Sequence, residues 1–181
     1  NVIMACVNLE QEVIIENASM EPEIVDLCNF YIKCGVIING VGTNKLSIKG
    51  IKIKEEINID YSIIPDRIEA GTFLIAATAT KGSIKINKCN YKHLDVVIDK
   101  LKEVGASIFF DNDSVSIKMK KEINSVSLET DVYPGFPTDL QAQWIALMSL
   151  SNNTSSIKDT IYLDRFTHVP ELVRLGAKID M

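Results

Sequence analysis

A carboxylate that follows a rigid turn is the residue best suited to chemistry in this chain. Residues 133–143 place two prolines and a glycine just before Asp139, and an apolar helix pattern follows. Two interpretations stay open. One is that Asp139 caps this helix, a common role of aspartate at a helix start. The other is that the stiff turn aims the carboxylate at a substrate hydroxyl, as a general base or an orienting acceptor.

An arginine at the start of an apolar helix pattern is the second candidate. Asp66 is suited to cap a helix that continues through residues 70–79, so Arg67 is expected in its first turn, facing the positive end of the helix dipole. A cation in this position costs stability in an isolated helix. A bound anion would compensate, so Arg67 is a candidate anion-binding residue.

A third candidate, Arg165, lies in a loop between an expected strand and an expected helix. Loops after strands often collect ligands, and a guanidinium suits a phosphate or a carboxylate. The alternative is an ion pair with Asp164 or Glu171. His168 has the simpler interpretation of a residue at the start of the next helix.

Glu21 and Glu23 flank Pro22 at the start of another expected helix. Helix capping and a favourable interaction with the helix dipole explain both carboxylates without a ligand. Binding of a ligand at this loop is the alternative.

These segments belong to a repeated unit. An amphipathic helix, a glycine and a short β-rich run occur three times, around Gly35, Gly105 and Gly176, at a spacing of about seventy residues. Each glycine suits the left-handed position that ends a helix. A more uniformly apolar helix precedes each copy and a strand follows that helix; the helices are residues 2–9, 68–80 and 140–150, and the strands residues 13–16, 83–87 and 155–161.

Other strands alternate apolar residues with Lys, Asn or Ser, as in residues 45–49 and 114–118, so each sheet has one wet face. Enclosed helices, together with strands that have one solvent-exposed face, predict an α/β (α+β) fold of βαβαββ units, with helices at the centre and sheets outside. A non-catalytic repeat module that binds a partner through its sheets has the same pattern.

The composition limits the classes of partner. The chain has 181 residues, 46% of them hydrophobic, and a net charge of -5, which argues against nucleic acid or a membrane surface as partner. We expect a cytoplasmic protein, because neither a secretion signal nor an apolar run of ~18 residues occurs. The four cysteines lack CxxC spacing and only two histidines are present, so we expect buried thiols and no metal site.

Five phrases in order along the chain resemble the UDP-N-acetylglucosamine enolpyruvyl transferase family, and the resemblance spans essentially the whole sequence. They are Glu21-Pro22-Glu23-Ile24-Val25-Asp26, Gly40-Val41-Gly42-Thr43, Ile64-Pro65-Asp66-Arg67-Ile68-Glu69-Ala70-Gly71-Thr72-Phe73, Phe136-Pro137-Thr138-Asp139-Leu140-Gln141-Ala142-Gln143, and Asp164-Arg165-Phe166 with His168-Val169-Pro170-Glu171-Leu172.

The resemblance implies an inside-out α/β barrel, in which two domains of three units each enclose a cleft for the substrates. Residues 1–64 would then be the last repeat unit of one domain, and residues 65–181 about two units of the second. The connection near Ile64 and Pro65 is a hinge candidate. Both domains would be incomplete, and we expect their cut surfaces to favour self-association.

The same resemblance implies a bacterial, cytoplasmic enzyme of the first committed step of peptidoglycan synthesis. Members transfer the enolpyruvyl group of phosphoenolpyruvate to the 3-hydroxyl of UDP-N-acetylglucosamine and release phosphate, without metal or organic cofactor. The family's acid cysteine and its Lys-Asn pair would lie upstream of Asn1, so we expect the fragment alone to be inactive. The shikimate-pathway enolpyruvyl transferase, which shares the fold, is the alternative.

Site residues follow from the resemblance position by position. Asp139 matches the family aspartate at the sugar 3-hydroxyl, and Ile161 matches an aliphatic position that contacts UDP-N-acetylglucosamine. The remaining positions at or near the cleft are Arg67, Glu21, Glu23, Tyr162 and Arg165.

Overall fold

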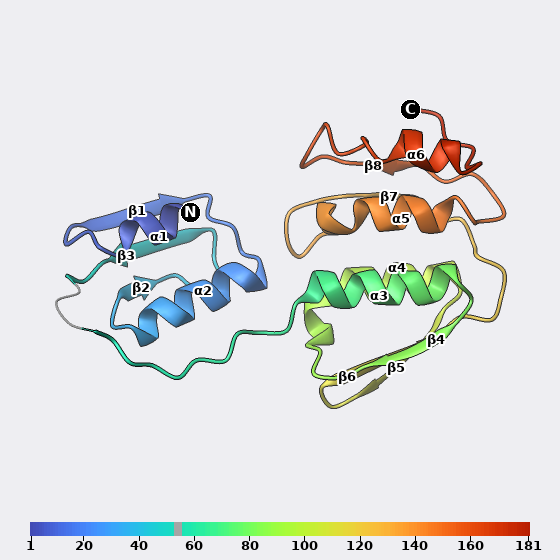
Figure 1. Cartoon of the computed structure of the whole chain (residues 1–181). Helices are drawn as coiled ribbons and strands as arrows, with labels where there is room; N and C mark the ends of the chain where they lie inside the picture. Colours follow the sequence, from blue (N-terminus) through green and yellow to red (C-terminus); the bar gives the residue numbers. More distant parts are fainter. Residues whose placement is uncertain (53–55) are drawn as a thin grey trace. The chain divides into compact units, whose positions relative to one another are not determined.

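The computed structural model describes residues 1–52 and 56–181, and they form two compact units, Asn1–Ile64 and Pro65–Met181 (Figure 1). Each unit has its own hydrophobic core. The described residues of the first unit form two helices and three strands, namely α1 (Val2–Cys6), β1 (Glu12–Glu16), α2 (Pro22–Lys33), β2 (Ile37–Asn39) and β3 (Lys45–Lys49).

The sheet of the first unit is antiparallel, with β3 in the middle of the order β1-β3-β2. Leu46 and Ile48 on β3 are buried in one core with side chains from α1 and α2, whereas Lys45 and Lys49 are exposed. The alternation expected for this strand is therefore confirmed, and both helices cover the apolar face of the sheet.

The second unit begins with the same pattern. Its antiparallel sheet has the order β4-β6-β5, and a short parallel pair, β7 with β8, follows. The elements are α3 (Arg67–Ala79), β4 (Ser83–Ile86), the 3-10 turn η1 (Tyr91–Leu94), α4 (Asp95–Val104), β5 (Ser107–Asp111), β6 (Ser114–Lys118), β7 (Leu128–Glu129), the 3-10 turn η2 (Thr138–Leu140), α5 (Gln141–Met148), β8 (Ile157–Lys158) and α6 (Val169–Arg174).

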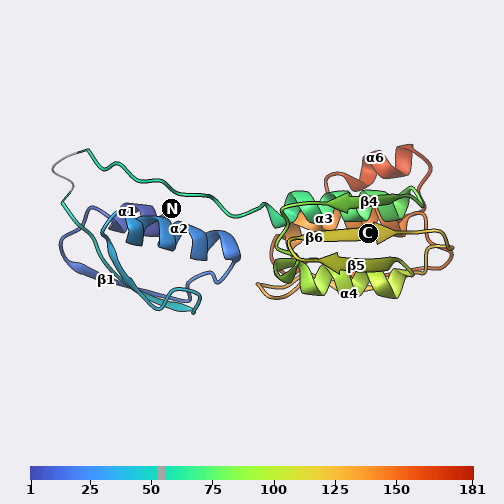
Figure 2. The ribbon, with the colours of Figure 1, turned by 90° about the horizontal axis from the view of Figure 1, so that it is seen from below.

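Helix α3 lies between the three-stranded sheet and α5, and Figure 2 shows the sheet spread across one side of the unit's helices. Leu74 on α3 and Trp144 on α5 are fully buried in the shared core. Gly71 allows this close packing, since a Cβ atom there would lie 2.5 Å from Cδ1 of Leu140. The expected α/β arrangement of enclosed helices with outer sheets is confirmed in this unit.

Helix ends follow the predicted chemistry. The Asp66 carboxylate caps α3 by accepting hydrogen bonds from the backbone N–H groups of Ile68 at 2.7 Å and Glu69 at 3.0 Å. Gly105 ends α4 with φ of +112°, a left-handed conformation that favours glycine.

Three of the predicted boundaries were wrong. The helix expected over residues 2–9 ends at Cys6, and the strand expected over residues 155–161 is reduced to β8. The β-rich run expected after Gly176, residues 177–179, forms no strand among the described residues; Ala177 donates its backbone N–H to the carbonyl of Leu172 and closes the end of α6.

The segment that ends the first unit is fastened to α2. The hydroxyl of Tyr61 donates a hydrogen bond of 2.7 Å to Asp26 on α2, and this bond is the largest of the causes that raise the pKa of Tyr61 to about 12. The ring of Tyr61 also meets Phe30 edge-on at 5.4 Å between centroids. The ammonium of Lys33 donates to the backbone carbonyl of Asp60.

The cysteines are free thiols. Cys6, Cys28 and Cys89 are buried, as expected, and Cys34 is half-buried. Burial raises the pKa of the Cys28 and Cys89 thiols, which keeps them protonated. In residues 1–52 and 56–181, no helix is long and apolar enough to cross a membrane.

Candidate functional site

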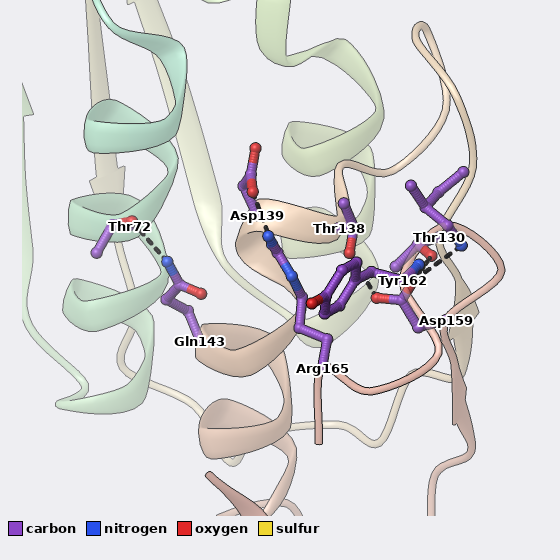
Figure 3. Close-up of polar contacts among 9 residues, drawn as sticks. Thr72, Thr130, Thr138, Asp139, Gln143, Asp159, Tyr162 and Arg165 are labelled. Carbon is purple, nitrogen blue, oxygen red and sulfur yellow. Dashed lines mark hydrogen bonds and ion pairs between the residues drawn. The ribbon is translucent and has the colours of Figure 1, made fainter. Parts of the chain in front are cut away.

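The parallel pair β7 and β8 brings two loops to one edge of the second unit. The carboxyl ends of parallel strands lie at the same edge, so the residues after Glu129 and after Lys158 meet there. The hydroxyl of Thr130 donates to the carboxylate of Asp159 at 2.9 Å (Figure 3). The Thr160 hydroxyl donates to the Thr130 carbonyl at 2.5 Å.

Asp159 organises this edge. Its side chain is buried, and its Oδ1 atom also accepts hydrogen bonds of 2.9 Å from the backbone N–H groups of Ile161 and Tyr162. Its Oδ2 atom accepts a bond of 2.6 Å from the Thr138 hydroxyl on η2. Burial alone would raise the pKa of Asp159, but these hydrogen bonds outweigh it and lower the pKa below the ordinary value, so the carboxylate stays ionised at neutral pH.

Asp139 lies one residue beyond Thr138, and its carboxylate forms an ion pair of 2.6 Å with the guanidinium of Arg165 (Figure 3). No side-chain capping bond is made at the start of η2 or of α5, both within the described residues, so the capping interpretation of Asp139 was wrong. The Asp139 side chain remains 53% exposed, which leaves it accessible to a ligand.

The partner of Arg165 also differs from the alternative weighed on sequence. Neither Asp164 nor Glu171 pairs with it among the described residues; Glu171 pairs instead with Arg174, three residues further on. The guanidinium of Arg165 lies 5.7 Å from the ring centroid of Tyr162, within the range of a cation–π contact.

Ile161 and Tyr162 form an exposed apolar surface beside this ion pair, with 44% and 57% of their areas accessible. His168 immediately precedes α6 and is half-buried. Burial lowers the pKa of His168, although a hydrogen bond with the backbone of Arg165 acts in the opposite direction. Four of the expected site residues, Asp139, Ile161, Tyr162 and Arg165, therefore gather at one edge of the unit.

Arg67 occupies the first position of α3, as expected, but it is only 7% exposed. Its guanidinium carbon lies 5.4 Å from the ring centroid of Tyr133, in the loop that leads to η2. The compensation expected from a bound anion is thus supplied at least in part by an aromatic face.

Glu21 and Glu23 lie in the first unit, at the start of α2. Glu21 holds the position before the helix but makes no side-chain capping bond there, so capping by its carboxylate was a wrong interpretation. The Ser19 hydroxyl donates to the Glu21 carboxylate instead. Glu23 is in the first turn, where an acidic side chain favours the helix dipole.

Sequence reasoning missed Asp159 and Thr138. The available signal was an aspartate within the strand predicted over residues 155–161, because Asp accepts backbone N–H bonds from the two or three residues after it and so tends to end a strand. Nothing local indicated the bond to Thr138, which lies 21 positions away.

No group of three or more His, Cys, Asp or Glu residues in the described parts of the chain is arranged to hold a metal ion. The site instead combines a paired carboxylate and guanidinium with an exposed apolar surface. This arrangement suits a polar ligand that has hydroxyl groups and a negative charge.

Comparison with known proteins identifies the family. The family model described as EPSP synthase (3-phosphoshikimate 1-carboxyvinyltransferase) matches residues 1–181. The chain belongs to the EPSP synthase family.

Within the EPSP synthase family, this chain is similar to curated proteins named UDP-N-acetylglucosamine 1-carboxyvinyltransferase. The protein of Rickettsia akari is 47% identical over 180 residues, which cover 99% of this chain and 42% of that protein. The protein of Geotalea daltonii is 46% identical over 179 residues, with the same shares covered. The protein of Shewanella halifaxensis is 44% identical over 182 residues, covering 100% of this chain and 43% of that protein. The chain therefore spans less than half the length of these relatives.

A solved member of the fold is the enolpyruvyl transferase NikO from Streptomyces tendae. It superposes with a TM-score of 0.83 at 20% sequence identity, and the match covers 99% of this chain and 42% of NikO. At this identity the likeness shows the fold alone, which is the enolpyruvyl transferase fold.

Proposed function

We propose that the full-length protein containing this chain transfers the enolpyruvyl group of phosphoenolpyruvate to the 3-hydroxyl of UDP-N-acetylglucosamine. The observation that carries this proposal is 44–47% identity, over nearly the whole chain, to proteins named UDP-N-acetylglucosamine 1-carboxyvinyltransferase. The exposed carboxylate of Asp139, beside an apolar surface and a guanidinium, supports it independently. As the first committed step of peptidoglycan synthesis, this reaction would take place in the bacterial cytoplasm.

The same proposal assigns the two units. Asn1–Ile64 would be the last repeat unit of one domain, and Pro65–Met181 would be about two repeat units of the second. In the complete protein, the residues that contact the substrates would include Glu21 and Glu23 of the first unit and Arg67, Asp139, Ile161, Tyr162 and Arg165 of the second.

In the proposed reaction, the 3-oxygen of the sugar forms a bond to carbon 2 of phosphoenolpyruvate while the methylene carbon takes up a proton. Loss of that proton and cleavage of the carbon–oxygen bond to phosphate restore the double bond and release phosphate. Asp139 would accept the hydrogen of the 3-hydroxyl, as base or orienting acceptor. A carboxylate can do so while paired with Arg165, since its two oxygens offer about four acceptor positions.

The other residues would hold the sugar nucleotide. Ile161 and Tyr162 offer an aliphatic and an aromatic surface to it. Arg165 would balance the negative charge of Asp139 and of the ligand. The protein's contribution would thus be positioning and electrostatic stabilisation.

The test is phosphate release by the full-length protein from phosphoenolpyruvate with either of two acceptors. Release with UDP-N-acetylglucosamine and none with shikimate 3-phosphate is expected. The opposite preference would establish the shikimate-pathway alternative. Phosphate release with neither acceptor would favour the hypothesis of a non-catalytic module.

Asp139→Asn tests the role of the carboxylate in the same assay. We expect turnover to fall by about 10²- to 10⁴-fold, the usual contribution of a positioned acid–base group. The matched control is Asp164→Asn, which changes a nearby exposed carboxylate that forms no ion pair with Arg165 in the described residues. Near-normal turnover and sugar-nucleotide affinity in Asp139→Asn would remove Asp139 from this role.

A further inference from the structure

Asp159 joins three segments of the site through one buried carboxylate. Its side chain is 5% exposed and accepts hydrogen bonds from the end of β7, from η2 and from the loop after β8. The family resemblance had assigned roles to residues on either side of it, at 139 and 161, and none to Asp159 itself. A buried, ionised carboxylate that accepts hydrogen bonds from several segments of the protein holds those segments in place.

The two carboxylate oxygens have different tasks. Oδ1 accepts the N–H groups of Ile161 and Tyr162 and the hydroxyl of Thr130, and these bonds give the loop after β8 its shape. In the described residues, Oδ2 accepts a hydrogen bond from the Thr138 hydroxyl at 2.6 Å. This second bond joins the shaped loop to the residue that immediately precedes Asp139.

Two contacts therefore span the gap between η2 and the loop after β8. The outer contact, Asp139 with Arg165, is solvent-exposed, and exposed ion pairs hold geometry weakly. The inner contact, Thr138 with Asp159, is partly buried, and its charged acceptor makes it a strong hydrogen bond. When a ligand engages Asp139 or Arg165, the inner contact is the one that keeps the spacing.

We propose that Asp159 is a positioning residue for the reaction proposed above. Through Thr138 it fixes the Asp139 carboxylate relative to the surface of Ile161 and Tyr162. The distance between the carboxylate that accepts the sugar hydroxyl and the surface that contacts the sugar nucleotide therefore stays constant. This inference rests on the proposed function. A displacement of about 1 Å at such a site can lower the rate by about 100-fold.

The experiment compares variants of the full-length protein in steady-state kinetics with both substrates. Thr138→Val removes the donor while keeping the side-chain shape, and Thr138→Ser restores the hydroxyl. We expect kcat to fall about 10- to 100-fold in Thr138→Val, with KM for phosphoenolpyruvate within about twofold of wild type, and to recover in Thr138→Ser. Thr80→Val, which removes an exposed hydroxyl at the far end of α3, is the control and should leave the kinetics unchanged.

A double-mutant cycle with Asp159→Asn separates action through the Thr138 bond from independent effects. If the two residues act through one bond, the double variant will lose less activity than the product of the two single losses. Amide hydrogen exchange at Ile161 and Tyr162 provides a readout without substrate: it should accelerate in Asp159→Asn and stay unchanged in Thr138→Val, because only the Oδ1 bonds hold those amides.

Three outcomes count against the inference. Wild-type kcat in Thr138→Val, failure of Thr138→Ser to recover, or fully multiplicative losses in the cycle would each overturn it while the proposed function stands. A wild-type protein that gives no turnover with UDP-N-acetylglucosamine would overturn the proposed function, and the positioning role with it.

Discussion

The side-chain amide of Gln143 on α5 donates a hydrogen bond of 3.0 Å to the hydroxyl of Thr72 on α3. The same hydroxyl donates to the backbone carbonyl of Ile68, 2.8 Å away and one turn earlier on α3. Thr72 thus links the two enclosed helices of the second unit through a single oxygen (Figure 3).

Thr72→Val should therefore destabilise the full-length protein by about 1 kcal/mol, because the half-buried amide of Gln143 loses its acceptor. Thr80→Val provides the comparison, since Thr80 makes the same kind of bond to a carbonyl one turn earlier without a partner on α5 in the described residues. Urea denaturation followed by circular dichroism measures both. Equal losses in the two variants would show that the bond between the helices contributes nothing.

Trp144 is the second stability test, because it fills the centre of the same core. Its indole N–H donates to the Val126 carbonyl at 3.3 Å, and its ring meets Phe136 edge-on at 5.3 Å. Trp144→Ala should cost about 3–5 kcal/mol of unfolding free energy. Phe73→Ala removes an aromatic ring that is mostly exposed, so it should cost less than about 1 kcal/mol in the same measurement.

Asp159 should make the protein sensitive to acid. Because its hydrogen bonds lower the pKa of the folded-state carboxyl below the ordinary value of 3.8, its ionised form stabilises the fold. That contribution is complete above the unfolded pKa and is lost as the pH falls through the folded one. Asp159→Asn should therefore be less stable at neutral pH and show a shallower loss of stability below about pH 4. Urea midpoints between pH 3 and pH 7 test this; parallel curves would contradict it.

Tyr61 should give the opposite dependence at alkaline pH. The bond to Asp26 favours the neutral phenol, so the pKa of Tyr61 is raised from 10.0 to about 12. The stability that this bond gives is complete below pH 10 and is lost as the pH rises towards 12. In an ultraviolet titration, Tyr61→Phe should remove the last tyrosinate phase, and Asp26→Asn should move that phase to lower pH. A last phase that persists in Tyr61→Phe would assign it to another tyrosine.

The repeated pattern made much of the fold predictable, because local rules govern it. Gly105 ends α4 in the left-handed conformation, Asp66 caps α3, and the alternation of Lys45 to Lys49 gives the buried face of β3. Each of these features depends on residues within a few positions of one another. The requirement to bury one face then decides which side chains of the strand point into the core.

The site was less predictable because its contacts are distant in sequence. The ion pair considered for Arg165 on the sequence was with a nearby carboxylate, Asp164 or Glu171, but its partner Asp139 is 26 positions away. The strand expected to continue to Ile161 stops at Lys158, because the carboxylate of Asp159 takes the backbone amides that a longer strand would have used. Single-sequence patterns contain no information on such pairings.

The brevity of β7 and β8 has a consequence for the variation that this region can accept. Two residues per strand provide only a short ladder of main-chain bonds, so Thr130 and Asp159 supply much of the connection between the loops. In most folds the positions that a structure depends on are apolar, and neighbouring side chains can repack around a substitution. Here the two positions are polar, and no other side chain can make the same hydrogen bonds. A saturation mutagenesis map should therefore show both as intolerant, in a neighbourhood where exposed residues accept almost any replacement.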